Sequence, residues 1–286
     1  MLEKGKEMLK KWVVISILIS LAFPAFPLFA GESPHSLEAN FKASYHDYKE
    51  IDLPEPFKSQ EKGFLPGMNL RYNYRGTKIP VYGRLIFEYQ QGETDYDGTT
   101  QGGSPIKDKT DNKFISGEGN IGFTFSAGPK GPPVSTTFYT GLGYRYWDRG
   151  LGGPSPYSEE YSWKYIPVGV LVTYRISERW TGEVEIAAWF ILDADIKVNL
   201  SEVDSNLNNP KMDLGNRVGW KIELPFAYRF SDRWSLNFVP SYEYYAFGNS
   251  NPAAITYAGA PTPITVYEPA SRSNIFSLSI GFKLHF

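Results

Sequence analysis

Apolar and polar residues alternate over long stretches of the chain. The clearest stretch runs from Val218 to Phe230, where the even positions are apolar or aromatic and Lys221, Glu223 and Arg229 lie at odd positions. A strand separates such residues onto two faces, whereas a helix would scatter them around its circumference. Similar alternation predicts ten strands, at 38–48, 66–76, 80–91, 113–126, 134–148, 161–176, 180–193, 216–230, 234–247 and 273–286.

The connections between these segments alternate in length. Residues 76–79, 127–133, 177–179 and 231–233 form short links, whereas 49–65, 92–112, 149–160, 194–215 and 248–272 are longer and rich in Pro, Gly, Asn, Asp and Ser. Short periplasmic turns and long outer loops are typical of outer-membrane barrels, whose strands span the membrane with about 9–11 residues. We therefore expect an all-β, closed, up-and-down antiparallel transmembrane barrel of about ten strands, with both chain ends on the periplasmic side.

The first thirty residues differ from the rest. Lys10 and Lys11 precede an apolar run from Trp12 to Phe23, and Ala30 provides a small residue for cleavage. A membrane-anchoring helix is the alternative, but the run is shorter than the ~20 residues needed to span a bilayer, and Pro24 ends it. We predict a signal peptide over 1–30, an outer-membrane barrel over 31–286 and export to the outer membrane of a Gram-negative cell envelope.

The amino-acid composition limits the kinds of reaction and binding site that the chain can form. The chain has no Cys and only three His, which excludes disulfides and Cys-dependent redox reactions. Removing residues 1–30 deletes four Lys and two Glu, which leaves 25 basic and 29 acidic residues and a net charge of −4. This balance predicts no nucleic-acid partner. No phosphate loop, Ser-His-Asp set or metal-ligand spacing stands out, so we expect no cofactor and no metal.

The inward face of the predicted barrel carries charges of both signs. A soluble sandwich or lipocalin-like barrel would also alternate, but it would bury its apolar face inside. A barrel of about ten strands is narrow enough for side chains to fill, so we predict a packed ionic network in the lumen and function in the outer loops. The predicted inward set is Asn69, Arg71, Asn73, Arg75, Arg84, Glu88, Glu118, Asn120, Arg145, Arg175, Glu183, Glu185, Lys221, Glu223, Arg229 and Glu243.

The strand plan, the Gly141–Tyr146 and Trp163–Val170 segments and the terminal Phe286 together resemble the omptins, which are outer-membrane endopeptidases, and the related ten-stranded adhesin barrels. The terminal aromatic also resembles the assembly signal of outer-membrane barrels. The resemblance implies two facing catalytic pairs, Asp-x-Asp in the second outer loop and Asp-x-His at the top of strand seven.

In this chain Asp95 and Asp97 match the first pair and Asp195 matches the Asp of the second. Lys197 stands where the family has its His, and an exposed Lys, with a pKa of ~10.4, is protonated and cannot act as the base. Among the histidines, His46 is predicted at the outer end of the first strand, away from the Asp95–Asp97 groove. A solvated turn or a loose calcium-binding loop explains Asp95 and Asp97 equally well.

Three functions follow from these observations. The first is a structural or binding barrel, adhesin-like, whose outer loops contact lipopolysaccharide or an extracellular ligand and whose insertion uses the barrel-assembly machinery. The second is an omptin-type, aspartic-type endopeptidase with an altered site, in which Asp95, Asp97 and Asp195 meet across one cleft. The third is a narrow, porin-like selective channel.

Overall fold

The computed structural model describes residues 34–76, 79–100, 103–126, 134–153 and 155–286. The predicted signal peptide and the predicted turn at 127–133 lie outside the described residues. Within the described part, no helix is both long and apolar enough to cross a membrane. The described residues form strands and one short 3-10 helix, η1 (Leu200–Glu202).

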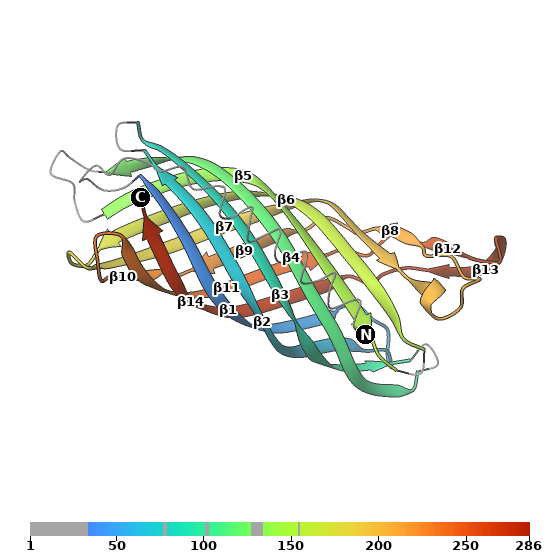
Figure 1. The fold of residues 1–286 in the computed structure, drawn as a ribbon. Helices are drawn as coiled ribbons and strands as arrows, with labels where there is room; N and C mark the ends of the chain where they lie inside the picture. The colour runs from blue at the N-terminus through green and yellow to red at the C-terminus, as the bar shows by residue number, and fades with distance from the viewer. Residues whose placement is uncertain (1–33, 77–78, 101–102, 127–133, 154) are drawn as a thin grey trace, which may run out of the picture. The chain divides into compact units, whose positions relative to one another are not determined.

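Ten barrel strands form a closed antiparallel sheet in which each strand pairs with its neighbours along the chain (Figure 1). The pairing of β1 with β14 closes the sheet. The eighth barrel strand consists of two pieces, β9 and β10, separated by Leu224 and Pro225; Pro225 has no backbone N–H for the ladder. The prediction of a ten-stranded, all-β, closed barrel is confirmed. The strands are β1 (His35–Glu50), β2 (Ser59–Arg75), β3 (Val81–Thr99), β4 (Pro105–Ser126), β5 (Val134–Leu151), β6 (Tyr157–Arg175), β7 (Trp180–Val198), β9 (Val218–Glu223), β10 (Phe226–Arg229), β11 (Trp234–Phe247) and β14 (Ser271–His285).

An apolar belt surrounds the barrel. Phe41, Phe64 and Leu142 are 61%, 69% and 70% exposed, while the neighbouring Asn40, Lys42 and Leu65 are buried inside. Exposed apolar side chains alternating with buried polar ones are the pattern of a strand with one lipid face and one lumen face. The two repeated turns have the predicted positions: the Ser177 hydroxyl accepts a hydrogen bond from the Trp180 amide, and the Ser231 hydroxyl accepts one from the Trp234 amide.

The strands continue further from the belt than the sequence predicted. The expected loop at 92–112 is mostly a continuation of β3 and β4, whose ladder runs to the Thr99–Pro105 pair. Alternation persists there although the residues are polar: Thr94 and Thr110 are buried inside, whereas Asp95 and Lys109 point outward. The connection at 149–160 shortens in the same way to residues 152–156. We call this end, opposite His35 and His285, the outer end.

A second, two-stranded sheet extends the outer end. Strands β12 (Ala253–Tyr257) and β13 (Ala260–Val266) form a hairpin that projects past the barrel strands (Figure 1). Its turn has Ala258 and Gly259 at φ 48° and 78°, as a tight two-residue hairpin requires. Ala253 and Val266, at its base, pack against the barrel interior. The short strand β8 (Lys211–Asp213) pairs with β7 nearby.

Candidate functional site

The carboxylates predicted as catalytic lie on the outer surface of the barrel wall. Asp95 and Asp97 occupy outward positions on β3, and Asp195 occupies one on β7, four strands away in the sheet. Each has its own lysine partner: Lys109 for Asp95, Lys58 for Asp97 at 2.5 Å, and Lys211 for Asp195 at 3.2 Å. The structure therefore does not bring the three carboxylates together.

The electrostatics of these positions are those of surface ion pairs. The hydrogen bond from Lys58 lowers the pKa of Asp97, and the hydrogen bond to Asp95 raises the pKa of Lys109. Lys197, which stands in place of the family histidine, also points outward, and its Nζ lies 3.2 Å from Glu160 Oε1. The shifts of Asp97 and Lys109 both favour the charged form, as expected of two members of ion pairs.

The three histidines lie away from these carboxylates. His46 is fully buried inside the barrel, where its Nε2 lies 3.3 Å from Ser273 Oγ and its ring packs edge-on against Trp147. His35 lies beside Tyr72, with Nδ1 2.7 Å from the phenol oxygen. His285 lies beside Ser235. The structure places no histidine of the described chain next to Asp95, Asp97 or Asp195.

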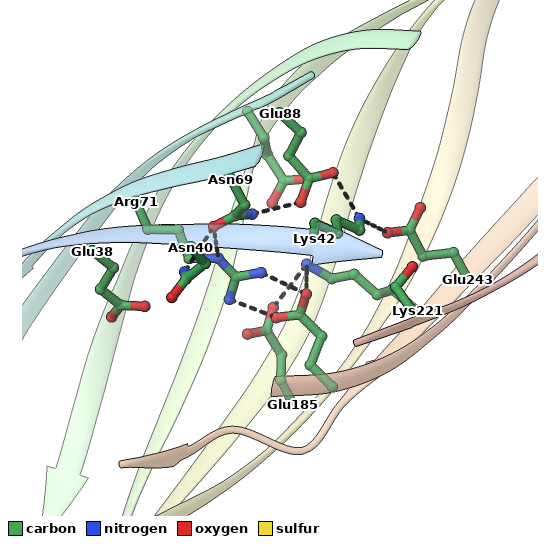
Figure 2. Close-up of polar contacts among 12 residues, drawn as sticks. Glu38, Asn40, Lys42, Asn69, Arg71, Glu88, Glu185, Lys221 and Glu243 are labelled. Carbon is green, nitrogen blue, oxygen red and sulfur yellow. Dashed lines mark hydrogen bonds and ion pairs between the residues drawn. The ribbon is translucent and has the colours of Figure 1, made fainter. Parts of the chain in front are cut away.

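Inside the membrane belt, the lumen holds a balanced ionic network, as the sequence predicted. Figure 2 shows Lys42 lying between Glu88 and Glu243, with its Nζ 3.2 Å from each carboxylate. Arg71 makes two 2.7 Å hydrogen bonds to Glu223. The network joins five basic and five acidic side chains, each less than 9% exposed: Lys42, Arg71, Arg84, Arg145 and Lys221 with Glu88, Glu118, Glu185, Glu223 and Glu243.

This network fills the lumen from wall to wall. Arg84 on β3 bonds Glu185 on β7 at 2.6 and 2.7 Å, and Arg145 on β5 bonds Glu243 on β11 at 2.9 Å. Strands that lie apart in the sheet are thus joined across the interior. A continuous water path would leave such side chains exposed to water, whereas they are almost completely buried.

Above the ionic network, the interior becomes aromatic. Trp147, Trp163 and Trp189 are at most 2% exposed, and Trp147 stacks on Tyr161 at 4.6 Å between ring centroids. Arg145 forms the boundary, since its guanidinium carbon lies 5.1 Å from the Trp189 ring centre. This half of the interior is a hydrophobic core of the kind found in soluble proteins. The alternation along the sequence did not predict it, because apolar faces were expected to lie toward lipid.

The outermost layer, which we call the mouth cluster, gathers the carboxylates Glu50, Glu61, Glu159 and Glu268 around the single guanidinium of Arg149. Arg149 Nη1 donates to Glu159 at 2.8 Å, and its Nε lies 3.4 Å from Glu61. Glu268 Oε1 instead accepts hydrogen bonds from Tyr48 and Tyr161. Within the described residues, no group of three or more His, Asp or Glu is arranged to hold a metal ion.

Burial and like charges dominate the titration of this cluster. Burial, followed by the negative charges of Glu50 and Glu159, raises the pKa of Glu268 well above its ordinary value, and Arg149 opposes that shift. Burial also raises the pKa of Glu50, again against Arg149. The mouth cluster is therefore a place where a carboxyl group retains its proton at a pH at which an exposed one would lose it.

The sequence contains signals for some of the inward residues that were not predicted. Lys42 lies in phase with Asn40 and His46 on the predicted first strand, so its inward direction could be derived from alternation. Arg149, Glu159 and Glu268 lay in segments interpreted as loops. If the alternation had been extended beyond residue 148 and to positions before 161, Arg149 and Glu159 would have been predicted to point inward. No local pattern in the sequence identifies Glu268.

Comparison with known proteins identifies the fold. No family model and no curated protein matches the sequence. The structure is similar to the outer membrane protease OmpT from Escherichia coli, with a TM-score of 0.66 and 10% identity over 92% of this chain and 99% of that chain. OprG from Pseudomonas aeruginosa also matches, with a TM-score of 0.42 and 11% identity over 90% of this chain and 98% of that one. At these identities the likeness concerns the fold alone, and the chain is an outer-membrane β-barrel.

Proposed function

We propose that this protein is a non-conducting outer-membrane barrel that binds an extracellular partner through its outer end, in an adhesin-like role. The observation that carries the proposal is the contrast between a filled interior and a projecting hairpin. Ion pairs fill the lumen at the level of the belt, an aromatic core fills it above, and β12–β13 extends beyond both. A rigid barrel that presents an exposed segment is a common arrangement for binding.

The hairpin has the character of a contact surface. Residues 248–267 contain no charged side chain. Tyr257, Ile264 and Tyr267 are 47%, 57% and 55% exposed, so the hairpin presents apolar and aromatic side chains to its surroundings. Pro261 and Pro263 lack the backbone N–H that an added strand would need, so the hairpin presents side chains rather than a free strand edge.

The proposal extends to the surroundings of the barrel. Lipopolysaccharide is the expected lipid partner around the outer belt, and the barrel-assembly machinery is the expected route of insertion. A peptidase function would need a catalytic group other than Asp95, Asp97 and Asp195, because these face away from the interior and are each paired with a lysine. A channel function would need the lumen network to open.

Replacing the hairpin tests the proposal. Ala253 and Val266 lie directly opposite each other, so residues 254–265 can be replaced by Asn-Gly, which closes a two-residue hairpin and leaves the barrel and Glu268 in place. Cells that display the protein should adhere to cultured epithelial cells or to one another, and cells with the shortened protein at equal surface level should not. Equal adherence by both would overturn the proposal.

Two assays on the purified protein distinguish the alternatives. In planar bilayers we expect no steady conductance, and stable unitary currents would favour the channel. In lipopolysaccharide micelles we expect no cleavage of a panel of basic peptides. Cleavage that disappears in an Asp95→Ala/Asp97→Ala variant would favour the peptidase.

A further inference from the structure

Glu268 occupies a position that joins the outer hairpin to the barrel. It lies between β13, which ends at Val266, and β14, which begins at Ser271. Its backbone N–H donates to Ser250 Oγ at 2.7 Å, and its carbonyl oxygen accepts from the Ser250 N–H at 2.9 Å. Ser250 precedes β12, so Glu268 ties together the two segments that enter and leave the hairpin.

The side chain of Glu268 reaches across the mouth of the barrel. Oε1 accepts a hydrogen bond from the Tyr161 hydroxyl on β6 at 2.8 Å and from the Tyr48 hydroxyl on β1 at 3.2 Å. In the ten-stranded barrel, β1 and β6 are five strands apart in either direction, so they lie on opposite sides. One carboxyl group therefore links the hairpin root to both walls, and it is 7% exposed.

The charges facing this group do not balance. Glu50 on β1, Glu61 on β2 and Glu159 on β6 are acidic, and Arg149 on β5 is the basic group that these carboxylates face among the described residues. Arg149 is already paired with Glu159 and Glu61. The remaining neighbours are phenols: Tyr48 on β1, Tyr96 on β3, and Tyr157 and Tyr161 on β6. If all four carboxylates ionise, one guanidinium faces four negative charges in a buried setting.

We propose that Glu268 is a pH-sensitive latch: protonated, it holds the root of the β12–β13 hairpin across the barrel mouth, and ionised, it releases the hairpin root. When neutral, the carboxyl group keeps its contacts with Tyr48 and Tyr161 without opposing Glu50 and Glu159. When charged, it is repelled by both and gains solvation by moving toward water. The latch concerns how the hairpin is held and does not depend on which partner the hairpin binds.

The sign of the pH dependence follows from linkage. Burial and the neighbouring acids raise the pKa of Glu268 in the latched arrangement, so that arrangement holds a proton more tightly than a solvent-exposed one. A fall in pH therefore favours the latched state, and a rise through the raised pKa disfavours it. Glu50, whose pKa is raised in the same direction, adds to this response.

Spin labels can measure the latch directly, since the chain has no native cysteine. Ala258→Cys places a label at the hairpin tip and Glu93→Cys places one on the outward face of β3. Double electron–electron resonance in detergent micelles should give a narrow distance distribution at pH 5 and a clearly broader one at pH 9. In Glu268→Gln, which mimics the neutral acid, the distribution should stay narrow at both values.

Two further variants keep the test decisive. Tyr161→Phe removes one of the two hydrogen bonds that hold the neutral carboxyl group across the mouth, so broadening should begin at lower pH than in the parent protein. Glu160→Gln, on the outer surface of β6, should respond like the parent protein. Circular dichroism and heat-modifiable electrophoresis confirm that each variant folds. A parent distribution that does not change between pH 5 and 9, or a Glu268→Gln variant that broadens like the parent, would overturn the latch.

Discussion

The lumen network and the mouth cluster are both buried and both charged, yet they differ in balance. In the lumen, five basic and five acidic side chains pair across the barrel. Glu185, for example, pairs with both Arg84 and Lys221. At the mouth, Arg149 pairs with Glu61 and Glu159, and the charges of Glu50 and Glu268 have no such ion pair with it. In the balanced lumen network every charge has a partner of opposite sign, so the network joins the barrel walls. In the mouth cluster the carboxylates repel one another, and binding a proton removes part of that repulsion.

The difference between the lumen network and the mouth cluster indicates which part of the molecule can respond to its surroundings. Buried ion pairs contribute little beyond what apolar packing would give, but removing one partner is costly because the other charge remains buried. The loss of any one charge of the lumen network is therefore expected to be strongly destabilising, whereas the mouth is expected to respond to pH.

Removing one charge from the lumen network should reduce the stability of the protein more than any other change considered. Glu185→Ala leaves Arg84 and Lys221 facing each other without their shared carboxylate, and we expect a loss of about 3–5 kcal/mol in the free energy of unfolding. Urea unfolding in detergent micelles, followed by tryptophan fluorescence, measures it. Glu93→Ala, on the outer face of β3, is the control. A loss under about 1 kcal/mol in Glu185→Ala would show that the network is not a brace.

Removing an aromatic anchor should have the next largest effect, confined to the outer half. Trp147 is fully buried and contacts Phe114, Tyr161 and, through its indole N–H, Asn112. Trp147→Ala should cost about 3 kcal/mol through lost burial and a cavity. Native-state hydrogen exchange should show faster exchange in outer β5 and β6 and unchanged exchange in the belt. Uniform acceleration along all strands would contradict two separable halves.

Removing the one cation of the mouth should give a smaller effect that depends on pH. In Arg149→Gln the carboxylates lose the charge that favours their ionised forms, so the variant should lose about 1–3 kcal/mol at pH 8 and clearly less at pH 5. Thermal unfolding at both pH values measures the difference. Lys164→Gln, from the exposed pair with Asp193, should show the same stability change at both values. A loss in Arg149→Gln that does not vary with pH would count against an unbalanced mouth.

The barrel could be predicted from sequence because lipid enforces a simple rule. Every second side chain of Val218–Phe230 must suit lipid, so the alternation is visible without knowing any contact. The same rule predicted the inward direction of Arg71 and Glu223. It could not predict that they bond each other, because strand number and stagger decide which inward residues meet across a barrel.

The outer end could not be predicted in the same way. Above the belt, the outer face of each strand meets water and the inner face meets the protein core. Trp147 and Trp163 therefore point inward, although tryptophan is a residue type that also suits a lipid-facing position. The rule that places apolar residues toward lipid fails there. Glu268 lies outside any regular strand, and its partners on β1 and β6 are more than 100 residues distant in sequence. Only the closed fold brings them together.

The smallest effect is expected at the outward carboxylates. Asp95 and Asp97 form exposed ion pairs with Lys109 and Lys58, and exposed pairs gain little because water and salt screen them. The double variant Asp95→Asn/Asp97→Asn should match the parent in urea midpoint, in adherence and in the pH response of the hairpin, because the changed groups touch neither the lumen network nor the mouth cluster. Measuring all three in 50 mM and 500 mM salt sharpens the test, since any weak contribution should disappear at the higher concentration. A marked loss of adherence that persists in high salt would place the binding surface on the outer face of β3 rather than on the β12–β13 hairpin. The outer surface of the barrel wall would then take part in binding, contrary to the proposal.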